Sequence, residues 1–151
     1  MGNNVSKFRE KMLSGKKLSH REQNMMDLML RNKGVRRVYI CAPYDGYNTR
    51  SREDIWWYCM FAKDLGCVPI APYYYYPAFF NMEDSRERSR LRSVAIGEQN
   101  YCDEVWAFGD RITPEMEIQL HFAAKRGLMI HYLPDWENMK DLLPEGDDDD
   151  E

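Results

Sequence analysis

The sequence alternates between short apolar segments and longer segments with helical spacing. The apolar segments read "RRVYICAP", "CVPIAP", "DEVWAFG" and "LMIHYL". They are rich in β-branched and aromatic residues, as buried strands are. Between them lie "TRSREDIWWYCMFAKDLG", a long segment from about Glu83 to Tyr101, and "TPEMEIQLHFAAKRG", which all predict helices. Strands that alternate with helices predict a parallel sheet covered by helices, an α/β fold.

The two ends of the chain differ in charge from its centre. Residues 1–37 hold ten Lys and Arg against three acids, whereas the tail "EGDDDDE" contributes −6. In "LSHREQNMMDLMLRNKG", Ser19 and Glu22 form a capping box and Gly34 ends the predicted helix. We therefore divide the chain into a basic helical extension (1–34), one α/β domain (35–144) and a disordered acidic tail (145–151). The apolar residues of the basic extension favour a docked amphipathic helix over a nucleic-acid-binding arm.

Several classes of function are disfavoured by composition. No apolar run approaches the about 20 residues of a membrane span, and the N-terminus lacks the apolar stretch of a signal peptide, so we expect a cytoplasmic protein. The cysteines show no CxxC spacing and lie in apolar segments, which favours buried free thiols. His20 and His131 have no partners at ligand spacing. We expect neither a metal nor another cofactor.

Ligands of parallel α/β folds bind beyond the carboxyl ends of the strands, which singles out the loops after Ile40, Ile70 and Phe108. The first of these loops, "CAPYDGYNTR", places Asn48, Arg50 and Ser51 around a predicted helix start. That arrangement suits a phosphate. The same residues also fit an ordinary strand–helix turn with capping side chains.

The motifs "VYICAPYDG", "GCVPIAPYYYYP", "CDEVWAFGD" and "ITPEM…A…G" together resemble the nucleoside 2-deoxyribosyltransferase-like superfamily. The likeness spans Arg37 to Leu133 and is closest to small uncharacterised bacterial and phage members. It implies a flavodoxin/Rossmann-like domain that binds a nucleoside or nucleotide. In active members a glutamate attacks C1′ of the deoxyribose and an acid group protonates the departing base. The result is transfer of the sugar to a second base, or hydrolysis of the N-glycosidic bond. Some relatives hydrolyse nucleotides with phosphate-binding residues in the first loop.

Mapping the resemblance onto the chain gives candidate site residues. Tyr44 and Asp45 fall in the substrate-binding loop. Asp110, at the end of the third strand, is either a site carboxylate or a loop cap ahead of Thr113. No carboxylate of this set occupies the position of the family's nucleophile.

That position belongs to Gln119, because the family pattern has alanine four and glycine eight residues after the glutamate, as Ala123 and Gly127 are here. At about 100° per residue, Gln119 lies on the inward face of the helix and Glu117 on the outer face. Glu115 also lies inward, either to favour the helix macrodipole or as a relocated nucleophile. An amide cannot attack C1′, so we expect Gln119 to bind the sugar. Catalysis is then lost, or carried by one of the two glutamates.

Further features concern binding partners. The segment "YYYYPAFF" is predicted to be an aromatic loop held by Pro72 and Pro77. This loop can stack a nucleobase or cover a subunit interface. Among Arg86, Arg88, Arg90 and Arg92, one or two are expected to face the pocket. One predicted helix has more apolar residues than a single buried stripe needs, because four of them fall outside that stripe: Trp56, Trp57, Met60 and Phe61. This excess predicts a homo-oligomer, a dimer or larger. The alternative is a non-catalytic interaction protein that binds protein or nucleic acid, with Tyr73–Tyr76 plugging the pocket.

Overall fold

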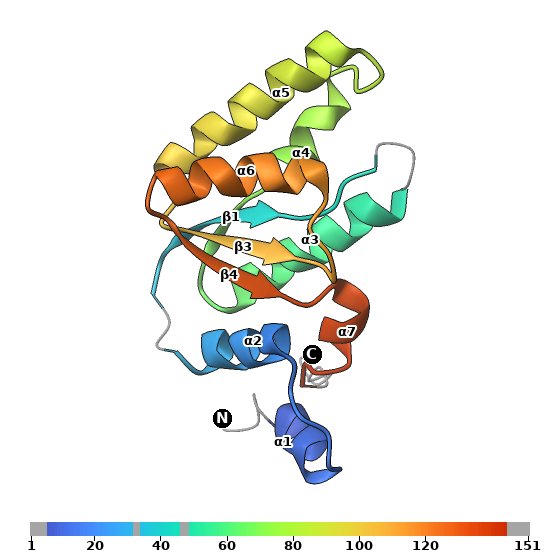
Figure 1. Ribbon diagram of the computed structural model, residues 1–151, viewed down its shortest axis with the longest axis vertical. Coiled ribbons are helices and arrows are strands. Elements are labelled where there is room, and N and C mark those ends of the chain that lie inside the picture. The colour runs from blue at the N-terminus through green and yellow to red at the C-terminus, as the bar shows by residue number, and fades with distance from the viewer. Residues whose placement is uncertain (1–5, 32–33, 46–48, 145–151) are drawn as a thin grey trace, which may run out of the picture.

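The computed structural model describes residues 6–31, 34–45 and 49–144 (Figure 1). Within these residues, a four-stranded parallel sheet has the order β2-β1-β3-β4. The strands are β1 (Arg37–Cys41), β2 (Val68–Ile70), β3 (Glu104–Phe108) and β4 (Met129–Leu133). The predicted α/β fold of flavodoxin/Rossmann type is confirmed. The chain leaves β1 toward β2 on one side and later returns to β3 on the other, which makes the β1/β3 boundary the topological switch point.

Helices occupy most of the remaining described chain. They are α1 (Ser6–Leu13), α2 (His20–Leu30), α3 (Thr49–Asp64), α4 (Pro72–Tyr75), α5 (Ser85–Glu98), α6 (Pro114–Lys125) and α7 (Trp136–Lys140), with 3₁₀ turns η1 (Tyr76–Ala78) and η2 (Gln99–Tyr101). The aromatic segment predicted as a loop is helical instead. Pro72 starts α4 because its fixed φ and missing N–H fit the first turn of a helix. The sequence did not predict α7.

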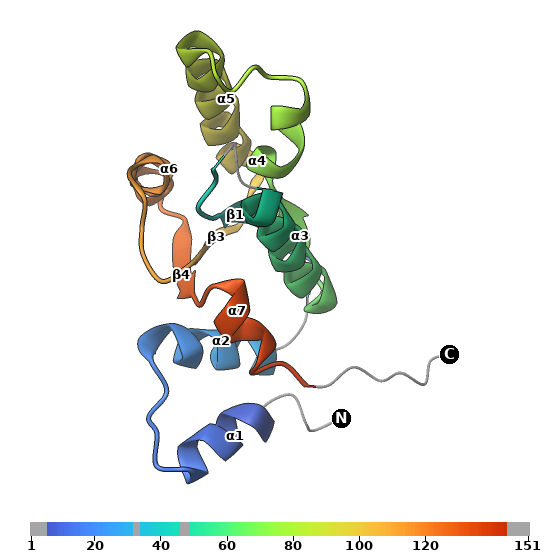
Figure 2. The same cartoon turned by 90° about the vertical axis from the view of Figure 1, so that its right-hand side faces the viewer.

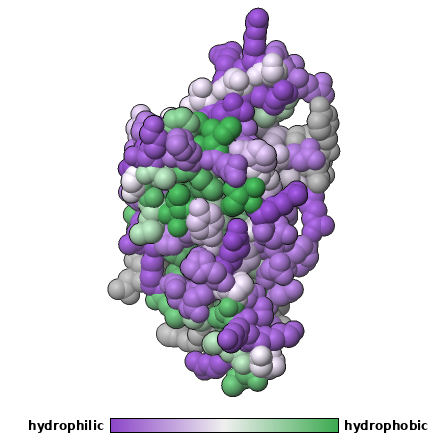
Figure 3. Space-filling view, viewed as in Figure 1, coloured by the Kyte–Doolittle hydropathy of each residue, from purple (hydrophilic) through white to green (hydrophobic). Residues whose placement is uncertain are grey.

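The two faces of the sheet are covered by different helices (Figure 2). Side chains alternate along β3, so that Trp106 and Phe108 point to the same face. There Trp106 meets Phe61 of α3 at a ring-centroid distance of 5.8 Å, and Phe108 stacks on Tyr58 of α3 at 4.0 Å. The opposite face is covered by α6, whose buried apolar residues are Met116, Leu120 and Ala123. Figure 3 shows a polar surface over α5 and apolar patches at the height of α6.

The capping box at the start of α2 is confirmed. The Ser19 hydroxyl accepts a hydrogen bond from the Glu22 amide at 3.1 Å, and the Glu22 carboxylate accepts one from the Ser19 amide at 2.8 Å. The helix ends at Leu30 and not near Gly34, because Arg31 turns to an extended backbone and its guanidinium donates to Glu104 of β3. The predicted tail, residues 145–151, lies outside the described residues.

The docking predicted for the basic extension is confirmed for α2. Met25, Leu28 and Met29 are buried in the core, and Phe8 of α1 is buried with them. Arg21 also donates from Nε to the Gly109 carbonyl at 2.6 Å. Among the described residues, no helix is both long and apolar enough to cross a membrane.

Candidate functional site

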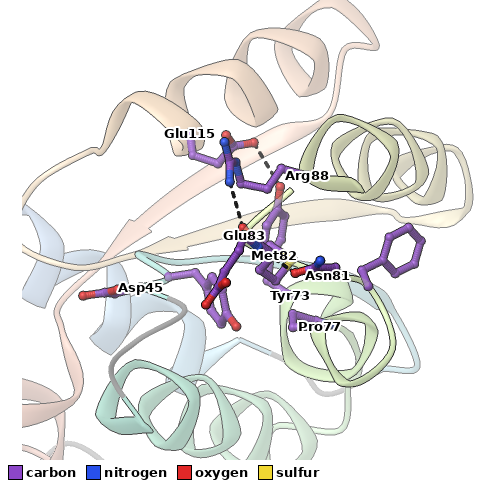
Figure 4. A pocket seen from close by; sticks show the side chains of 10 residues that line it. Asp45, Tyr73, Pro77, Asn81, Met82, Glu83, Arg88 and Glu115 are labelled. Atoms are coloured by element: carbon purple, nitrogen blue, oxygen red, sulfur yellow. Dashed lines mark hydrogen bonds between the residues drawn. The ribbon is translucent and has the colours of Figure 1, made fainter. Parts of the chain in front are cut away.

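A pocket of about 570 Å³ opens at the carboxyl edge of the sheet (Figure 4). Its lining comes from the segments that follow β1, β2 and β3 and from α5: Tyr44, Asp45, Tyr73, Pro77, Phe80, Asn81, Met82, Glu83, Arg88 and Glu115. The pocket therefore lies at the edge that the sequence singled out, beside the switch point between β1 and β3. Its volume is within the range of small-molecule sites.

Glu115 is the most firmly held carboxylate of this pocket. Arg92 of α5 donates from Nε to Oε2 at 2.8 Å and from Nη2 to Oε1 at 2.9 Å. The Tyr73 hydroxyl donates to Oε2 at 2.9 Å, as Figure 4 shows. The Arg92 hydrogen bonds lower the pKa of Glu115 against the opposing effect of burial, so this side chain is ionised at neutral pH.

The start of α6 sets the position of Glu115. The Thr113 hydroxyl accepts from the Met116 amide at 3.2 Å and caps the helix, and Pro114 occupies its first turn. Glu115 follows in the same turn, where the positive end of the macrodipole favours a carboxylate. The inward placement predicted for Glu115 is confirmed. The residue lies in the first turn of α6 and also lines the pocket.

Tyrosine rings form the aromatic part of the pocket. Tyr44 and Tyr73 lie 5.8 Å apart between ring centroids, inclined by 50°. Burial raises the pKa of both phenols, which are therefore neutral donors at physiological pH. The other tyrosines of the aromatic segment point elsewhere, since Tyr74 packs under Arg52 and the Tyr76 hydroxyl donates to Glu98. The segment lines the pocket without filling it.

The alternating arginines of α5 separate by helix face. Arg88 and Arg92, four residues apart, lie on the side of the pocket. Arg88 donates from Nη1 to the Met82 carbonyl at 2.8 Å, which fixes the loop before α5. Arg90 instead pairs with Glu87 at 3.2 Å and is largely exposed.

Gln119 is buried as the sequence indicates, but its surroundings differ from the predicted sugar site. Its Oε1 accepts from the Tyr39 hydroxyl at 2.8 Å, and its Nε2 donates to the Glu115 carbonyl at 3.3 Å. The side chain is 2% exposed and does not line the pocket. Gln119 is therefore a core residue between α6 and β1, because the sheet continues beneath this second turn of the helix.

Other candidate residues lie away from the pocket. Glu117 is exposed on α6, in agreement with the predicted outer face. Asp110 is exposed in the turn after β3, next to Gly109 with its positive φ of 124°. Neither residue lines the pocket.

The first loop contributes less than the sequence suggested. Tyr44 and Asp45 line the pocket, whereas Arg50 pairs with Glu137 of α7 at the surface. The Ser51 hydroxyl exchanges hydrogen bonds with the backbone of Asp45, accepting from its amide at 3.2 Å and donating to its carbonyl at 3.1 Å. Asn48 lies outside the described residues. Arg50 and Ser51 thus support the capping alternative more than the phosphate site.

Sequence reasoning missed the loop between η1 and α5. There the Asn81 side-chain carbonyl accepts from the Glu83 amide at 3.1 Å, which closes a tight turn at the pocket rim. Met82 and Glu83 line the pocket beside it. The only available signal was the rule that binding loops follow strand ends, here the end of β2.

Comparison with known proteins adds a family. Residues 36–133 match the family described as Domain of unknown function (DUF7768). The chain belongs to this family. The DUF7768 region contains every strand of the sheet and every residue that lines the pocket, whereas α1, α2 and α7 lie outside it. No curated protein matches the chain.

Proposed function

We propose that the protein binds a nucleoside or nucleotide in this pocket and that Glu115 acts on its N-glycosidic bond. The observation that carries the proposal is an ionised carboxylate, oriented by Arg92 and Tyr73, in a pocket at the carboxyl edge of a parallel sheet. The sequence resemblance supplies the ligand class. The open pocket supports ligand binding over the alternative of a scaffold whose pocket is plugged by its own tyrosines.

The geometry of Glu115 leaves room for nucleophilic attack. A carboxylate has about four lone-pair sites. Oε2 accepts from Arg92 and Tyr73, while Oε1 accepts from Arg92 alone among the described residues. In the proposed step Oε1 forms a bond to C1′ as the C1′–N bond breaks, and the bonding electrons leave with the base, which takes up a proton from water. Water or a second base then attacks C1′ and releases Glu115.

The aromatic lining supports recognition of the base. Tyr44, Tyr73 and Phe80 contribute aromatic side chains to the lining of the pocket. Stacking of a nucleobase on an aromatic side chain contributes about 1–3 kcal/mol and tolerates any base. The same pocket can therefore hold a base over its rings and present the sugar to Glu115.

The first prediction tests Glu115. Wild-type protein is incubated with deoxynucleosides, ribonucleosides and their monophosphates, and released or exchanged base is measured by chromatography, with binding measured by calorimetry. Glu115→Gln keeps the side chain's size and removes the nucleophile. We expect base release to fall by about 10³-fold or more, since loss of a nucleophile abolishes covalent catalysis.

Glu117→Gln is the matched control, because it makes the same change on the exposed face of the same helix. It should keep the wild-type rate. A rate that is lost in Glu117→Gln and kept in Glu115→Gln would contradict the role of Glu115. If the wild type binds these ligands without releasing the base, the proposed ligand class would stand and the proposed reaction would be wrong.

A further inference from the structure

The charged residues that line the pocket are mostly acidic. Asp45, Glu83 and Glu115 contribute three carboxylates, against the single guanidinium of Arg88. A phosphate monoester adds about −1.5 to −2 charges at neutral pH and is bound where cationic groups and N–H donors converge. The predominant charge of this lining is therefore opposite in sign to that of a phosphate-binding site.

The arginines around the pocket are already engaged. Arg92 makes its paired hydrogen bonds to Glu115. Arg88 donates to the Met82 carbonyl, and Figure 4 shows its guanidinium beside Glu115, whose pKa its charge helps to lower. Arg52 lies over the ring of Tyr74 at 4.4 Å, outside the lining. A phosphate that entered the pocket would compete with Glu115 for the positive charges of Arg92 and Arg88.

Glu83 places a negative charge at the pocket rim. Its backbone amide is bonded to Asn81, and the neighbouring Met82 carbonyl is bonded to Arg88, so the turn that carries it is fixed at both places. In the described part of the chain its carboxylate has no hydrogen-bond or ion-pair partner. Carboxylates accept hydrogen bonds from sugar hydroxyls and repel phosphates.

We infer that the pocket takes a nucleoside with a free 5′-hydroxyl and excludes the corresponding 5′-monophosphate. This inference rests on the proposed function and narrows its ligand class. Specificity of this kind comes from like charges placed against the wrong ligand. The carboxylate of Glu83 supplies that repulsion, and the same group can accept a hydrogen bond from a hydroxyl of the right ligand.

The second prediction compares each deoxynucleoside with the 5′-monophosphate of the same base by calorimetry. We expect the nucleoside to bind the wild type about tenfold more tightly or better at low ionic strength, as one or two like-charge contacts near a protein surface require. The ratio should shrink as salt is added, since exposed charges are screened.

Two substitutions of Glu83 test the cause. Glu83→Gln should reduce the preference for the nucleoside, and Glu83→Lys should reduce it further or reverse it. Glu10→Lys makes the same charge change on α1, at the other end of the molecule from α5 (Figure 1), and should leave the ratio unchanged.

The outcomes separate the inference from the proposed function. A monophosphate that binds the wild type as tightly as its nucleoside would overturn the inference and leave the proposed function standing. A nucleoside preference that Glu83→Lys and Glu10→Lys shift equally would overturn the role given to the rim carboxylate. If neither ligand class binds, the proposed function fails and the inference fails with it.

Discussion

Glu115 and Gln119 lie one turn apart on α6 but meet different surroundings. Glu115 projects from the first turn into the pocket, where Arg92 and Tyr73 hold it. Gln119 lies over the sheet, where the hydroxyl of Tyr39 donates to its side-chain oxygen. The difference comes from position along the helix axis, since both side chains lie on the inward side. On this inward side of α6, a carboxylate is tolerated at the turn that opens on the pocket.

The third prediction concerns Gln119→Glu, the substitution that places a glutamate at the position where the sequence resemblance puts the nucleophile of nucleoside 2-deoxyribosyltransferase-like proteins. The new carboxylate would be buried and would lose the N–H donor that bonds the Glu115 carbonyl. We expect the free energy of unfolding to fall by about 2–4 kcal/mol near neutral pH. Base release should not increase, because position 119 does not line the pocket. Urea unfolding and the chromatographic assay measure the two effects.

The pH dependence of the stability of this variant gives a second test of whether residue 119 is buried. Burial raises the folded pKa of the new carboxyl above its unfolded value. The penalty is therefore absent below the unfolded pKa and grows as the pH rises through it. A penalty that did not change with pH, or a gain in base release, would show that residue 119 faces water or the ligand.

At the scale of elements, the contact between Arg92 and Glu115 joins α5 to α6. The two side chains are 34% and 36% exposed, and Tyr73 of α4 bonds to the same carboxylate. Two helices that follow β2 and one that follows β3 are thus tied together at the pocket. The pair orients the carboxylate, while its exposure to water limits what it adds to stability.

The fourth prediction is the pH dependence of that pair. The pKa of Glu115 is lowered from its ordinary 4.5 in the folded state, so its contribution is fully present above the unfolded pKa. It is lost as the pH falls through the lowered pKa. Arg92→Met should reduce the free energy of unfolding by about 0.5–1 kcal/mol at neutral pH, a value already discounted for screening. Urea unfolding should give equal stabilities for the two proteins in acid.

Arg90→Met is the control on the same helix. Arg90 pairs with Glu87, is 73% exposed itself, and within the described residues makes no hydrogen bond or ion pair with Glu115. Its removal should change the free energy of unfolding little at any pH. An Arg92→Met deficit that persisted unchanged in acid would point to lost packing rather than to the ion pair.

At the scale of the whole molecule, the N-terminal segment belongs to the core. Glu104 at the start of β3 is buried and accepts hydrogen bonds from Arg31 at the end of α2 and from Trp106. Burial acts to raise the pKa of Glu104, but these hydrogen bonds outweigh it and the pKa is lowered. Arg36 lies 3.6 Å from the same carboxylate, so the charge of Glu104 is balanced partly within the family region 36–133 and partly by Arg31 outside it.

The predicted homo-oligomer now rests on fewer residues. Phe61 is 4% exposed and packs against Trp106 within the chain, which removes it from a subunit interface. Trp56 and Trp57 are 40% and 41% exposed on α3, and Trp57 stacks on Trp136. These exposed indoles are the surface on which the prediction depends.

The fifth prediction is a dimer or larger assembly that Trp56→Ser weakens. Tryptophan is enriched among residues whose removal costs about 2 kcal/mol or more of binding energy. Sedimentation equilibrium at micromolar concentrations should therefore show a shift toward monomer in the variant. Tyr101→Ser, at a ring that is 74% exposed on η2, should leave the assembly unchanged. A monomeric wild type would contradict the prediction.

The sequence by itself determined the elements that depend on local spacing. Alternating strands and helices, the capping box of Ser19 and Glu22, and the outward face of Glu117 all follow from contacts within a few residues. Their hydrogen bonds and faces are properties of one element. The prediction of a loop for the aromatic segment was wrong, because its helical turns depend on packing against α5, through hydrogen bonds such as that from Tyr76 to Glu98.

Only the tertiary structure decided which carboxylate belongs to the pocket. Glu115 is held by Arg92, 23 residues away, and by Tyr73, 42 residues away. A helical projection fixes the direction of a side chain around its axis, but not how far the helix extends past the sheet. The placement of Gln119 over the sheet and of Glu115 beyond its edge is set by how α6 packs against β1 and β4, and that packing depends on the whole core.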